Sequence, residues 1–515
     1  MTSRRHPVQT LTYAPFTPPR LYAAIAETLF SISTTSHEIL ATWHTPPAPL
    51  QGKVAPQSKN PKTQPENEKE DAEEVSPSKA ENEAVTAESG DVEMTDSTSQ
   101  PPIGKRKRSP SNTPTKPAPP SDHVESKKSK RSKKHKPETV AAKLLPNYIG
   151  QIVYIPTKHI LAVTTLEDKS LRLLDCDSLE VIKEWVLHKR PSAITITDSN
   201  STILVGDKFG DVYAYSIPNT TTTTTTSPSQ PELADAKLLL GHVSLLTTLT
   251  TVTLPPSQTR STTAQNANGK AAEKQYIITA DRDEHIRITN YPHTHAIHTF
   301  CLSHTQFVSR LLITSQNTLL SGGGDDWLGV WDWYSGTLLQ QVGLREIIAG
   351  IYPDEEERGK LVEKMKGYNT RRRRREGEEE EREVVVAVRE ILEVEGGIVV
   401  VVLEGVPVLL RFEVVETGRV EYRGFTRTPG PVLSLTGADG GRVYFGCDVG
   451  DNEKGGLVLY ADMGVEEPRV CELFEGERKG LEGVRVEEGE EDAVNERLYS
   501  VEGLRKGFGG MGEDE

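Results

Sequence analysis

The stretch HTQFVSRLLITSQNTLLSGGGDDWLGVWD, residues 304–332, decides the fold of this chain. Two short apolar runs, Leu319–Leu320 and Leu328–Trp331, flank a turn that is rich in Gly and Asp. Apolar runs of this length around a polar turn predict two antiparallel strands. The same hairpin recurs along the chain, at residues 160–163 with 171–174, 203–205 with 212–215, and 277–278 with 286–288.

Further strand-like runs continue the series at residues 384–388, 398–403, 408–412, 432–435, 443–445 and 457–460. Once insertions are discounted, the repeat interval is about 40 to 45 residues, which is the size of a β-propeller blade. The sequence therefore predicts an all-β chain that forms a single propeller of about seven blades, in which ring closure protects the sheet edges. The first blade is expected to begin near residues 20–44.

Residues 304–332 closely resemble a WD repeat, so the expected fold is a WD-repeat β-propeller. In that family four side chains hydrogen-bond to one another and lock two strands to the loop before the blade. The resemblance implies that these residues are His304, Ser321, Asp325 and Trp331. In the preceding repeat it implies His242, Thr279 and Asp283. Thr289 stands where Trp is expected there, which predicts a looser blade.

A Ser, a His and an Asp within one repeat also raise the alternative of a hydrolase. The sequence lacks the Gly-x-Ser-x-Gly elbow of an α/β-hydrolase. Likewise, Gly322–Gly324 leads through a turn into a strand, whereas a cofactor loop lies between a strand and a helix. We therefore expect no catalytic residue, no metal, no cofactor and no small-molecule substrate.

The composition predicts long insertions. Hydrophobic residues make up 35% of the 515 residues, below the roughly 45% typical of globular chains. Residues 1–45 should form N-terminal strands and the first blade, and residues 46–140, rich in Pro, Ser, Glu and Lys, a disordered insertion. Residues 141–352 should hold further blades, residues 353–383 a charged insertion that forms a solvated helix or loop, residues 384–470 the remaining blades, and residues 471–515 an acidic tail.

Two basic clusters lie within residues 46–140 and are separated by a Pro-rich spacer. This arrangement is typical of a bipartite nuclear import signal, because an acidic receptor groove binds an extended Lys/Arg strip. A solubilising tail and a nonspecific RNA contact are the alternatives. We expect a nuclear protein whose import residues are Lys105, Arg106, Lys107, Arg108, Lys127, Lys128, Lys130, Arg131, Lys133 and Lys134.

Charge and cysteine usage narrow the classes of function. The formal net charge of -15 argues against a protein that coats nucleic acid, because neutralising phosphates requires a surplus of Lys and Arg.

The most apolar stretch, Ile398–Leu410, is shorter than the roughly 20 residues that span a bilayer, so we expect a soluble intracellular protein with no membrane contact. The cysteines lack the close spacing of a zinc site or a disulfide framework, and buried free thiols are expected at Cys176, Cys301, Cys447 and Cys471.

Three segments are more specific than the repeat itself: GDKFGDVY at residues 206–213, LGHVS at 240–244 and TADRDEHIRI at 279–288. In this order they look like the non-catalytic WD-repeat subunit of the eukaryotic tRNA (guanine-N7)-methyltransferase. The resemblance runs from about residue 148 to residue 340, with a weaker echo at 497–502. The long insertion and the Arg/Glu-rich segment at 371–381 depart from that pattern.

The resemblance implies a scaffold and not an enzyme. In that family this subunit does not bind the methyl donor. It forms a heterodimer with a Rossmann-like catalytic subunit that methylates a guanine in the tRNA variable loop, so tRNA would be contacted only through the complex. The family's partner contact implies Arg282, His285 and Arg287 as partner-binding residues.

Arg287 is expected to be exposed, because side chains alternate along a strand and its neighbours Ile286 and Ile288 should be buried. A purely structural place on the strand surface is the alternative for Arg287. For the whole chain the alternative is a generic WD-repeat adaptor in a nuclear chromatin or ubiquitin-ligase complex.

Overall fold

The computed structural model describes residues 6–48, 146–218, 236–254, 273–368, 386–449, 458–473, 491–501 and 504–505. The chain divides into one unit of residues 1–50 and 143–515 and a second unit of residues 51–142. All described residues belong to the first unit. The expected disordered insertion at residues 46–140 therefore lies almost entirely outside the described residues.

Seven four-stranded antiparallel sheets make up the described part of the first unit, and each is built from four consecutive strands. Blade 1 contains β1 (Thr10–Ala14), β2 (Arg20–Ile25), β3 (Thr28–Ser33) and β4 (Ile39–His44). Blade 2 contains β5 (Ile149–Ile155), β6 (Ile160–Thr165), β7 (Ser170–Asp175) and β8 (Val181–Val186), with the short 3-10 helix η1 (Pro156–Lys158). Blade 3 contains β9 (Pro191–Ile196), β10 (Thr202–Asp207), β11 (Asp211–Ser216) and β12 (Lys237–Gly241).

The remaining four blades repeat this plan. Blade 4 contains β13 (Leu246–Leu254), β14 (Lys274–Asp281), β15 (Ile286–Tyr291) and β16 (Ile297–Cys301). Blade 5 contains β17 (Val308–Ile313), β18 (Leu319–Gly323), β19 (Trp327–Asp332) and β20 (Thr337–Gly343). Blade 6 contains β21 (Val388–Val394), β22 (Ile398–Leu403), β23 (Val408–Val414) and β24 (Val420–Arg427). Blade 7 contains β25 (Val432–Gly437), β26 (Arg442–Cys447), β27 (Val458–Asp462) and β28 (Cys471–Glu472), with η3 (Asp439–Gly441).

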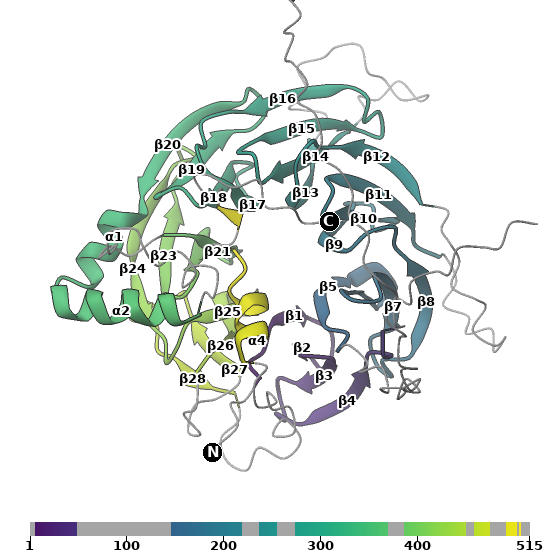
Figure 1. Cartoon of the computed structure of the whole chain (residues 1–515), viewed down its shortest axis with the longest axis horizontal. Helices are drawn as coiled ribbons and strands as arrows, with labels where there is room; N and C mark the ends of the chain where they lie inside the picture. The colour runs from purple at the N-terminus through teal and green to yellow at the C-terminus, as the bar shows by residue number, and fades with distance from the viewer. Residues whose placement is uncertain are drawn as a thin grey trace, which may run out of the picture. The chain divides into compact units, whose positions relative to one another are not determined.

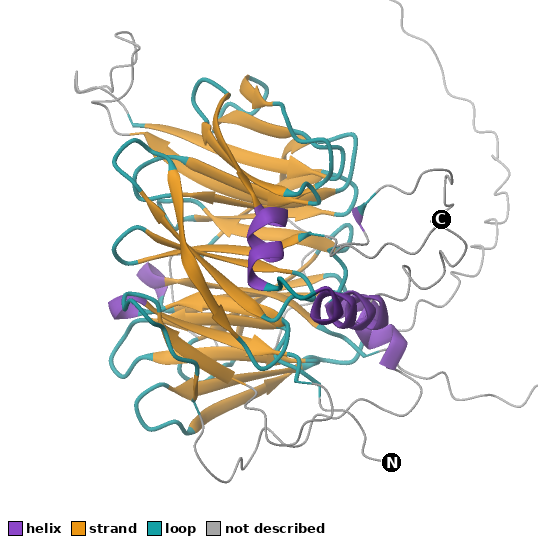
Figure 2. Ribbon diagram, turned by 90° about the vertical axis from the view of Figure 1, so that its left-hand side faces the viewer, coloured by secondary structure: helices purple, strands orange, loops and turns teal. Residues whose placement is uncertain are grey.

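The blades close into a ring (Figure 1). The first strand of each blade contacts the first strand of the next, from β1 through β5, β9, β13, β17 and β21 to β25, and β25 contacts β1 again. Buried apolar side chains fill the spaces between neighbouring sheets. The strand-rich disc is seen from its edge in Figure 2. The predicted single propeller of seven blades is confirmed.

One face of the disc is important for the site. The first strand of each blade begins at this face and the second strand ends there, so the turn between the second and third strands and the loop that enters each blade lie together. This face is termed the proximal face. In blade 4 it carries the loop at residues 242–245 and the turn at residues 282–285.

The structure moves two boundaries expected from the sequence. Blade 1 begins at Thr10, ahead of the predicted start near Arg20, because β1 supplies its innermost strand and pairs with β2. The last blade ends with β28 at Cys471–Glu472, just beyond the predicted limit at residue 470. The region assigned to an acidic tail also contains the helix α4 (Glu491–Leu498).

Two helices lie on the outside of the ring beside β24 (Figure 1). The helix α1 (Leu344–Ile351) follows β20 directly, and α2 (Glu355–Tyr368) occupies the first part of the segment expected to be a solvated helix or loop. Buried side chains of both helices belong to the core cluster shared with blades 5 and 6, so α2 packs through one face. Residues 369–385, which include the arginine run, lie outside the described residues.

Candidate partner-binding surface

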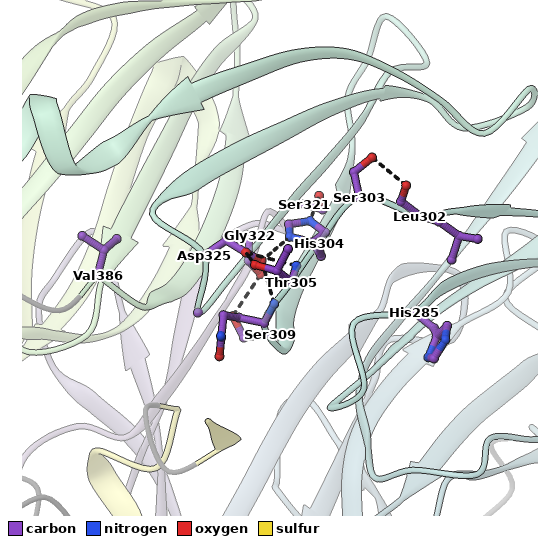
Figure 3. A network of polar contacts seen from close by, with 12 residues as sticks. His285, Leu302, Ser303, His304, Thr305, Ser309, Ser321, Gly322, Asp325 and Val386 are labelled. Carbon is purple, nitrogen blue, oxygen red and sulfur yellow. Dashed lines mark hydrogen bonds and ion pairs between the residues drawn. The ribbon is translucent and has the colours of Figure 1, made fainter. Parts of the chain in front are cut away.

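A chain of buried polar contacts ties blade 5 to the loop that enters it (Figure 3). His304 Nδ1 lies 2.7 Å from Asp325 Oδ2, and His304 Nε2 lies 2.7 Å from Ser321 Oγ. Trp331 Nε1 donates to Ser321 Oγ over 2.8 Å. The structure thus brings together the four side chains that the WD resemblance named for this blade.

The chemistry of these groups fixes the direction of the hydrogen bonds. An indole N–H only donates and an ionised carboxylate only accepts. Trp331 therefore donates to Ser321, Ser321 donates to His304, and His304 donates to Asp325. Burial alone raises the pKa of Asp325, but the hydrogen bonds from His304 and Thr305 outweigh it and hold that pKa below its usual value. Because every member of this buried network has a hydrogen-bond partner, the network stabilises the blade.

Blade 4 uses a different carboxylate from the one expected. His242 Nε2 lies 2.8 Å from Thr279 Oγ1, as the comparison with blade 5 implied, but His242 Nδ1 lies 2.9 Å from Asp281 Oδ2. The assignment of Asp283 to this network was wrong. Blade 5 has a glycine, Gly323, at the position of Asp281, so matching the two blades residue by residue pointed to Asp283.

The second oxygen of Asp281 explains why this residue is preferred. Asp281 Oδ1 accepts hydrogen bonds from the backbone N–H groups of Asp283 (2.9 Å) and His285 (3.1 Å), so one carboxylate holds both the turn and the histidine. Burial raises the pKa of Asp281, but the hydrogen bonds from His242 and His285 outweigh that effect and lower it overall.

The missing tryptophan leaves a defect in blade 4. Thr289 occupies the position of Trp331, is fully buried, and its hydroxyl has no hydrogen-bond partner among the described residues. The Thr279 hydroxyl has two acceptors in reach, His242 Nε2 at 2.8 Å and Arg287 O at 3.3 Å. The network of blade 4 therefore lacks its fourth member.

Arg282 and His285 lie in the turn between β14 and β15 on the proximal face. The side chain of His285 is 52% exposed, and Nδ1 lies 3.5 Å from Asp281 Oδ1. Arg282 Nε donates to the backbone oxygen of Leu504 over 3.0 Å, which ties this turn to the C-terminal segment. Figure 3 shows His285 across from Leu302, which lies in the loop between blades 4 and 5.

Arg287 is less accessible than the sequence predicted. Ile286 and Ile288 are buried, as alternation along the strand requires, but Arg287 is half-buried on the opposite side of β15. Its Nη1 donates to Gly241 O over 3.0 Å, and its Nε is buried without a partner among the described residues. Burial lowers the pKa of this guanidinium. The end of blade 3 covers Arg287, an arrangement that the pattern within β15 alone could not indicate.

Three exposed apolar side chains accompany these residues on the proximal face. They are Phe209 at 63% exposure, Val243 fully exposed, and Leu302 at 61%. The turn that holds Phe209 adjoins the loop that holds Val243, because His242 N donates to Gly210 O over 2.9 Å. Phe209 and Val243 fall within the segments quoted from the sequence, but only the structure shows that they lie outside the core.

Further predictions from the sequence, about nuclear import, cysteines, membrane helices and metal sites, concern other parts of the chain. The ten Lys and Arg residues assigned to nuclear import, at positions 105–134, lie outside the described residues. Cys176, Cys301 and Cys447 are buried free thiols, whereas Cys471 is exposed at the edge strand β28, contrary to expectation. Within the described ranges no helix is long and apolar enough to cross a membrane. The same ranges contain no cluster of His, Cys, Asp and Glu that could hold a metal ion.

Comparison with known proteins places the chain in a family. Residues 21–237 and 219–454 match the family described as the tRNA methyltransferase TRM82 WD40 domain. The chain belongs to the TRM82 WD40 family. The two matched stretches include all seven blades except β1 and the C-terminal parts of blade 7.

Relatives in the TRM82 family bear one description. A tRNA (guanine-N(7)-)-methyltransferase non-catalytic subunit of Phaeosphaeria nodorum is 30% identical over 68% of this chain and 80% of the relative. The subunit of the same name in Aspergillus oryzae is 39% identical over 36% of this chain and 44% of the relative. That of Meyerozyma guilliermondii is 36% identical over 40% of this chain and 45% of the relative. The chain thus spans less than half the length of two of these three relatives.

Proposed function

We propose that this chain is the non-catalytic scaffold subunit of a tRNA (guanine-N7)-methyltransferase. It binds and stabilises the catalytic subunit and is required for N7-methylguanosine formation in the tRNA variable loop, and tRNA meets it only through the complex. Family membership and the names of the relatives support this proposal. A scaffold that binds only the active conformation of its partner raises the population of that conformation.

The observation that carries the proposal is the composition of the proximal face of blades 3 and 4. Arg282 and His285 stand beside exposed apolar side chains, foremost Val243. Protein interfaces commonly have a desolvated apolar centre with charged residues around it. This surface suits a partner that presents an apolar patch bordered by carboxylates.

The decisive test is binding of the purified catalytic subunit to a charge-reversed surface. His285→Glu places a negative charge where the partner would present acidic groups, and repulsion should weaken the complex about tenfold or more. The control is His293→Glu, which makes the same change in the exposed turn after β15, at the opposite face of blade 4. Co-purification, N7-methylation of tRNA and the melting temperature of each variant are measured.

Arg287→Glu is a poor test of the contact, because it would set a carboxylate against the Gly241 carbonyl and destabilise the propeller itself. The side chain of His285 is 52% exposed, and the melting temperature of His285→Glu separates repulsion by the nearby Asp281 carboxylate from an effect on binding. Normal assembly and normal methylation with His285→Glu would exclude this surface. Failure of the unmodified chain to bind any catalytic methyltransferase subunit would overturn the function itself.

We also propose that the chain accumulates in the nucleus through its two basic clusters. Replacing the ten residues between Lys105 and Lys134 with neutral ones should lower the nuclear fraction of a tagged chain while leaving partner binding intact. An unchanged distribution between nucleus and cytoplasm would contradict this role.

A further inference from the structure

The C-terminal segment lies against the proximal face of the ring. Its helix α4 stands beside β25 at the inner edge of the ring (Figure 1). Val494, Leu498 and Tyr499 pack against Leu433 of β25 in a small buried cluster. Farther along, Val501 and Leu504 pack against Phe307 and Ala387, where blades 5 and 6 begin. The segment is therefore a packed part of the propeller and not a solvated tail.

Buried acids of two blades accept hydrogen bonds from this segment. Tyr499 Oη donates to Asp448 Oδ2 over 2.5 Å at the end of β26 in blade 7. Val501 N donates to Glu404 Oε1 over 3.0 Å at the end of β22 in blade 6. Asp448 is 2% exposed and Glu404 5% exposed. Because hydrogen bonds to ionised groups are strong when shielded from water, these two contacts fix the segment on blades 6 and 7.

An arginine in the ring binds the end of α4. Arg389 Nη1 donates to Leu498 O over 2.5 Å, and its Nε donates to Leu433 O over 2.7 Å. The last carbonyl groups of a helix carry partial negative charge and favour a nearby cation. Arg389, on the inner strand of blade 6, thus joins α4 to the inner strand of blade 7.

The same segment reaches blades on both sides of blade 1. The Arg497 guanidinium lies 4.2 Å from the ring centroid of Tyr148, and its Nη2 lies 3.5 Å from Glu167 Oε1 in blade 2. At the other end, Arg505 Nη2 donates to Gly324 O of blade 5 over 2.7 Å. Arg282 Nε of blade 4 donates to Leu504 O. The described residues of this segment, 491–501 with 504 and 505, thus contact blades 2, 7, 6, 5 and 4.

The junction between the first and last blades has no shared strand among the described residues, since every sheet is made of consecutive strands. It depends on packing of β1 against β25 and on a few hydrogen bonds. Ser434 Oγ donates to Val8 O over 3.2 Å, and Tyr13 N donates to Thr436 Oγ1 over 3.1 Å. A ring closed in this way gains stability from any element that bridges across blade 1.

We propose that residues 491–501, with 504 and 505, are a clasp that holds the propeller ring closed across blade 1 and fixes the turn that carries Arg282. The clasp bridges blades 7 and 2, which flank blade 1, and its far end binds Arg282 on blade 4. The consequence for Arg282 rests on the proposed partner-binding function, whereas the closure of the ring does not.

Hydrogen exchange of the full chain and of two shortened chains tests the clasp without any partner. A chain that stops after Glu490 lacks the clasp, and a chain that stops after Arg505 keeps it and loses only the residues beyond. In the shorter chain the amides of β1 and β25 should exchange about tenfold faster or more, because local opening becomes more frequent. Amides of β10, remote from the clasp contacts, should be unchanged in both. Unchanged exchange at β1 and β25, or equal acceleration in every blade, would overturn the clasp.

A full-length variant decides the question if the shorter chain does not fold. Tyr499→Phe removes only the hydroxyl that binds Asp448 and should accelerate exchange at β25 and β26 several-fold. Tyr422→Phe, at a more exposed tyrosine of β24, is the matched control and should change nothing. Identical exchange in the two variants would overturn the clasp.

Partner binding is measured separately from ring closure. Loss of the clasp should weaken capture of the catalytic subunit by the chain that stops after Glu490 but not by the chain that stops after Arg505. If the full chain captures no catalytic subunit, the proposed function fails while the exchange result still judges the clasp. If capture is equal in all three chains, the clasp does not control Arg282.

Discussion

Asp207 and Asp281 occupy the same turn position in neighbouring blades, but only Asp281 has a histidine partner. Asp207 Oδ1 accepts hydrogen bonds from Phe209 N (2.8 Å) and Asp211 N (3.2 Å), as Asp281 Oδ1 does from its own turn. Asp207 Oδ2 is buried without a partner among the described residues, whereas Asp281 Oδ2 is bound by His242. The aspartate therefore stabilises blade 4, whereas in blade 3 its buried and unpaired carboxylate oxygen destabilises the fold.

Substitution by asparagine should have opposite effects at these two sites. Asp207→Asn keeps the oxygen that caps the turn and removes a buried unpaired charge, so we expect a gain of about 1 kcal/mol in the free energy of unfolding. Asp281→Asn places a donor against the His242 N–H and should cost about 1 to 3 kcal/mol. Urea unfolding at pH 7 measures both. A loss of stability in Asp207→Asn as large as that in Asp281→Asn would contradict this interpretation.

The pH dependence of stability should separate the same carboxylates. Hydrogen bonds outweigh burial at Asp281 and Asp325 and lower their pKa values, so their stabilisation is complete above the ordinary carboxyl pKa and is lost as pH falls through the lowered values. Burial raises the pKa of Asp207, so its destabilisation is complete above that raised value and is lost as pH falls from there to the ordinary carboxyl pKa. The advantage of Asp207→Asn over the unmodified chain should therefore shrink as unfolding is repeated from pH 7 toward pH 4. A constant advantage would show that Asp207 is not the titrating group.

The buried hydroxyl of Thr289 predicts that valine is tolerated or preferred there. Thr289→Val keeps the shape and removes an unpaired hydroxyl, so stability should stay equal or rise by about 1 kcal/mol. Thr279→Val is the control, since the same exchange on the neighbouring strand leaves His242 without its hydroxyl partner and should cost about 1 to 3 kcal/mol. Equal losses in thermal or urea unfolding would show that the Thr289 hydroxyl stabilises the fold.

Gly210 should resist substitution more than an ordinary turn glycine. Its φ is +96°, and an added Cβ would lie 2.5 Å from Ser244 O and 2.6 Å from His242 O. Gly396 has a similar φ of +83° with nothing within 4 Å of an added Cβ. Gly396→Ala should cost about 1 kcal/mol from backbone strain alone, and Gly210→Ala clearly more. Equal melting temperatures of the two variants would show that the loop at residues 242–244 moves away at little cost.

Val243 offers a test of the partner surface that spares the fold. It is fully exposed, so Val243→Glu should leave the melting temperature unchanged. Loss of an apolar contact at the centre of an interface commonly costs about 1 to 2 kcal/mol or more, and capture of the catalytic subunit should fall accordingly. Val465→Glu, at an exposed apolar residue of blade 7, is the control. If both variants capture the partner as well as the unmodified chain, the apolar part of the surface lies elsewhere.

The repeat pattern predicted the fold because each hairpin is local. Strand pairs such as β18 and β19 join residues close in sequence, and their alternation is visible in any short window. Strands were expected within residues 1–45, but the sequence did not place β1 in blade 1, because TLTYA has a weak apolar signal and part of its burial comes from blade 7 at the other end of the chain. Nothing near Thr10 in the sequence indicates that partner.

The residues of the polar networks could be predicted where the blades share one spacing, but not where the path of a turn differs between blades. The blade 5 network follows from the spacing of its four residues, but the same spacing misassigned Asp283, because the choice between two nearby carboxylates depends on the path of the turn. The group that binds the Arg287 side chain is the backbone carbonyl of Gly241, which belongs to another blade. The role of the C-terminal segment depends on contacts such as that of Tyr499 with Asp448, which no periodicity within residues 491–505 indicates.

The consecutive order of strands within every blade has a consequence for synthesis on the ribosome. A nascent chain emerges from its N-terminus, and each sheet can complete its hydrogen bonds as soon as its own four strands have left the exit tunnel. The first blade to emerge is also the last to find all its neighbours, since Val8 meets Ser434 across 426 positions of sequence. Blade 1 therefore waits with the side that faces blade 7 uncovered until β25 has been synthesised, and that interval is when a chaperone would have most to protect.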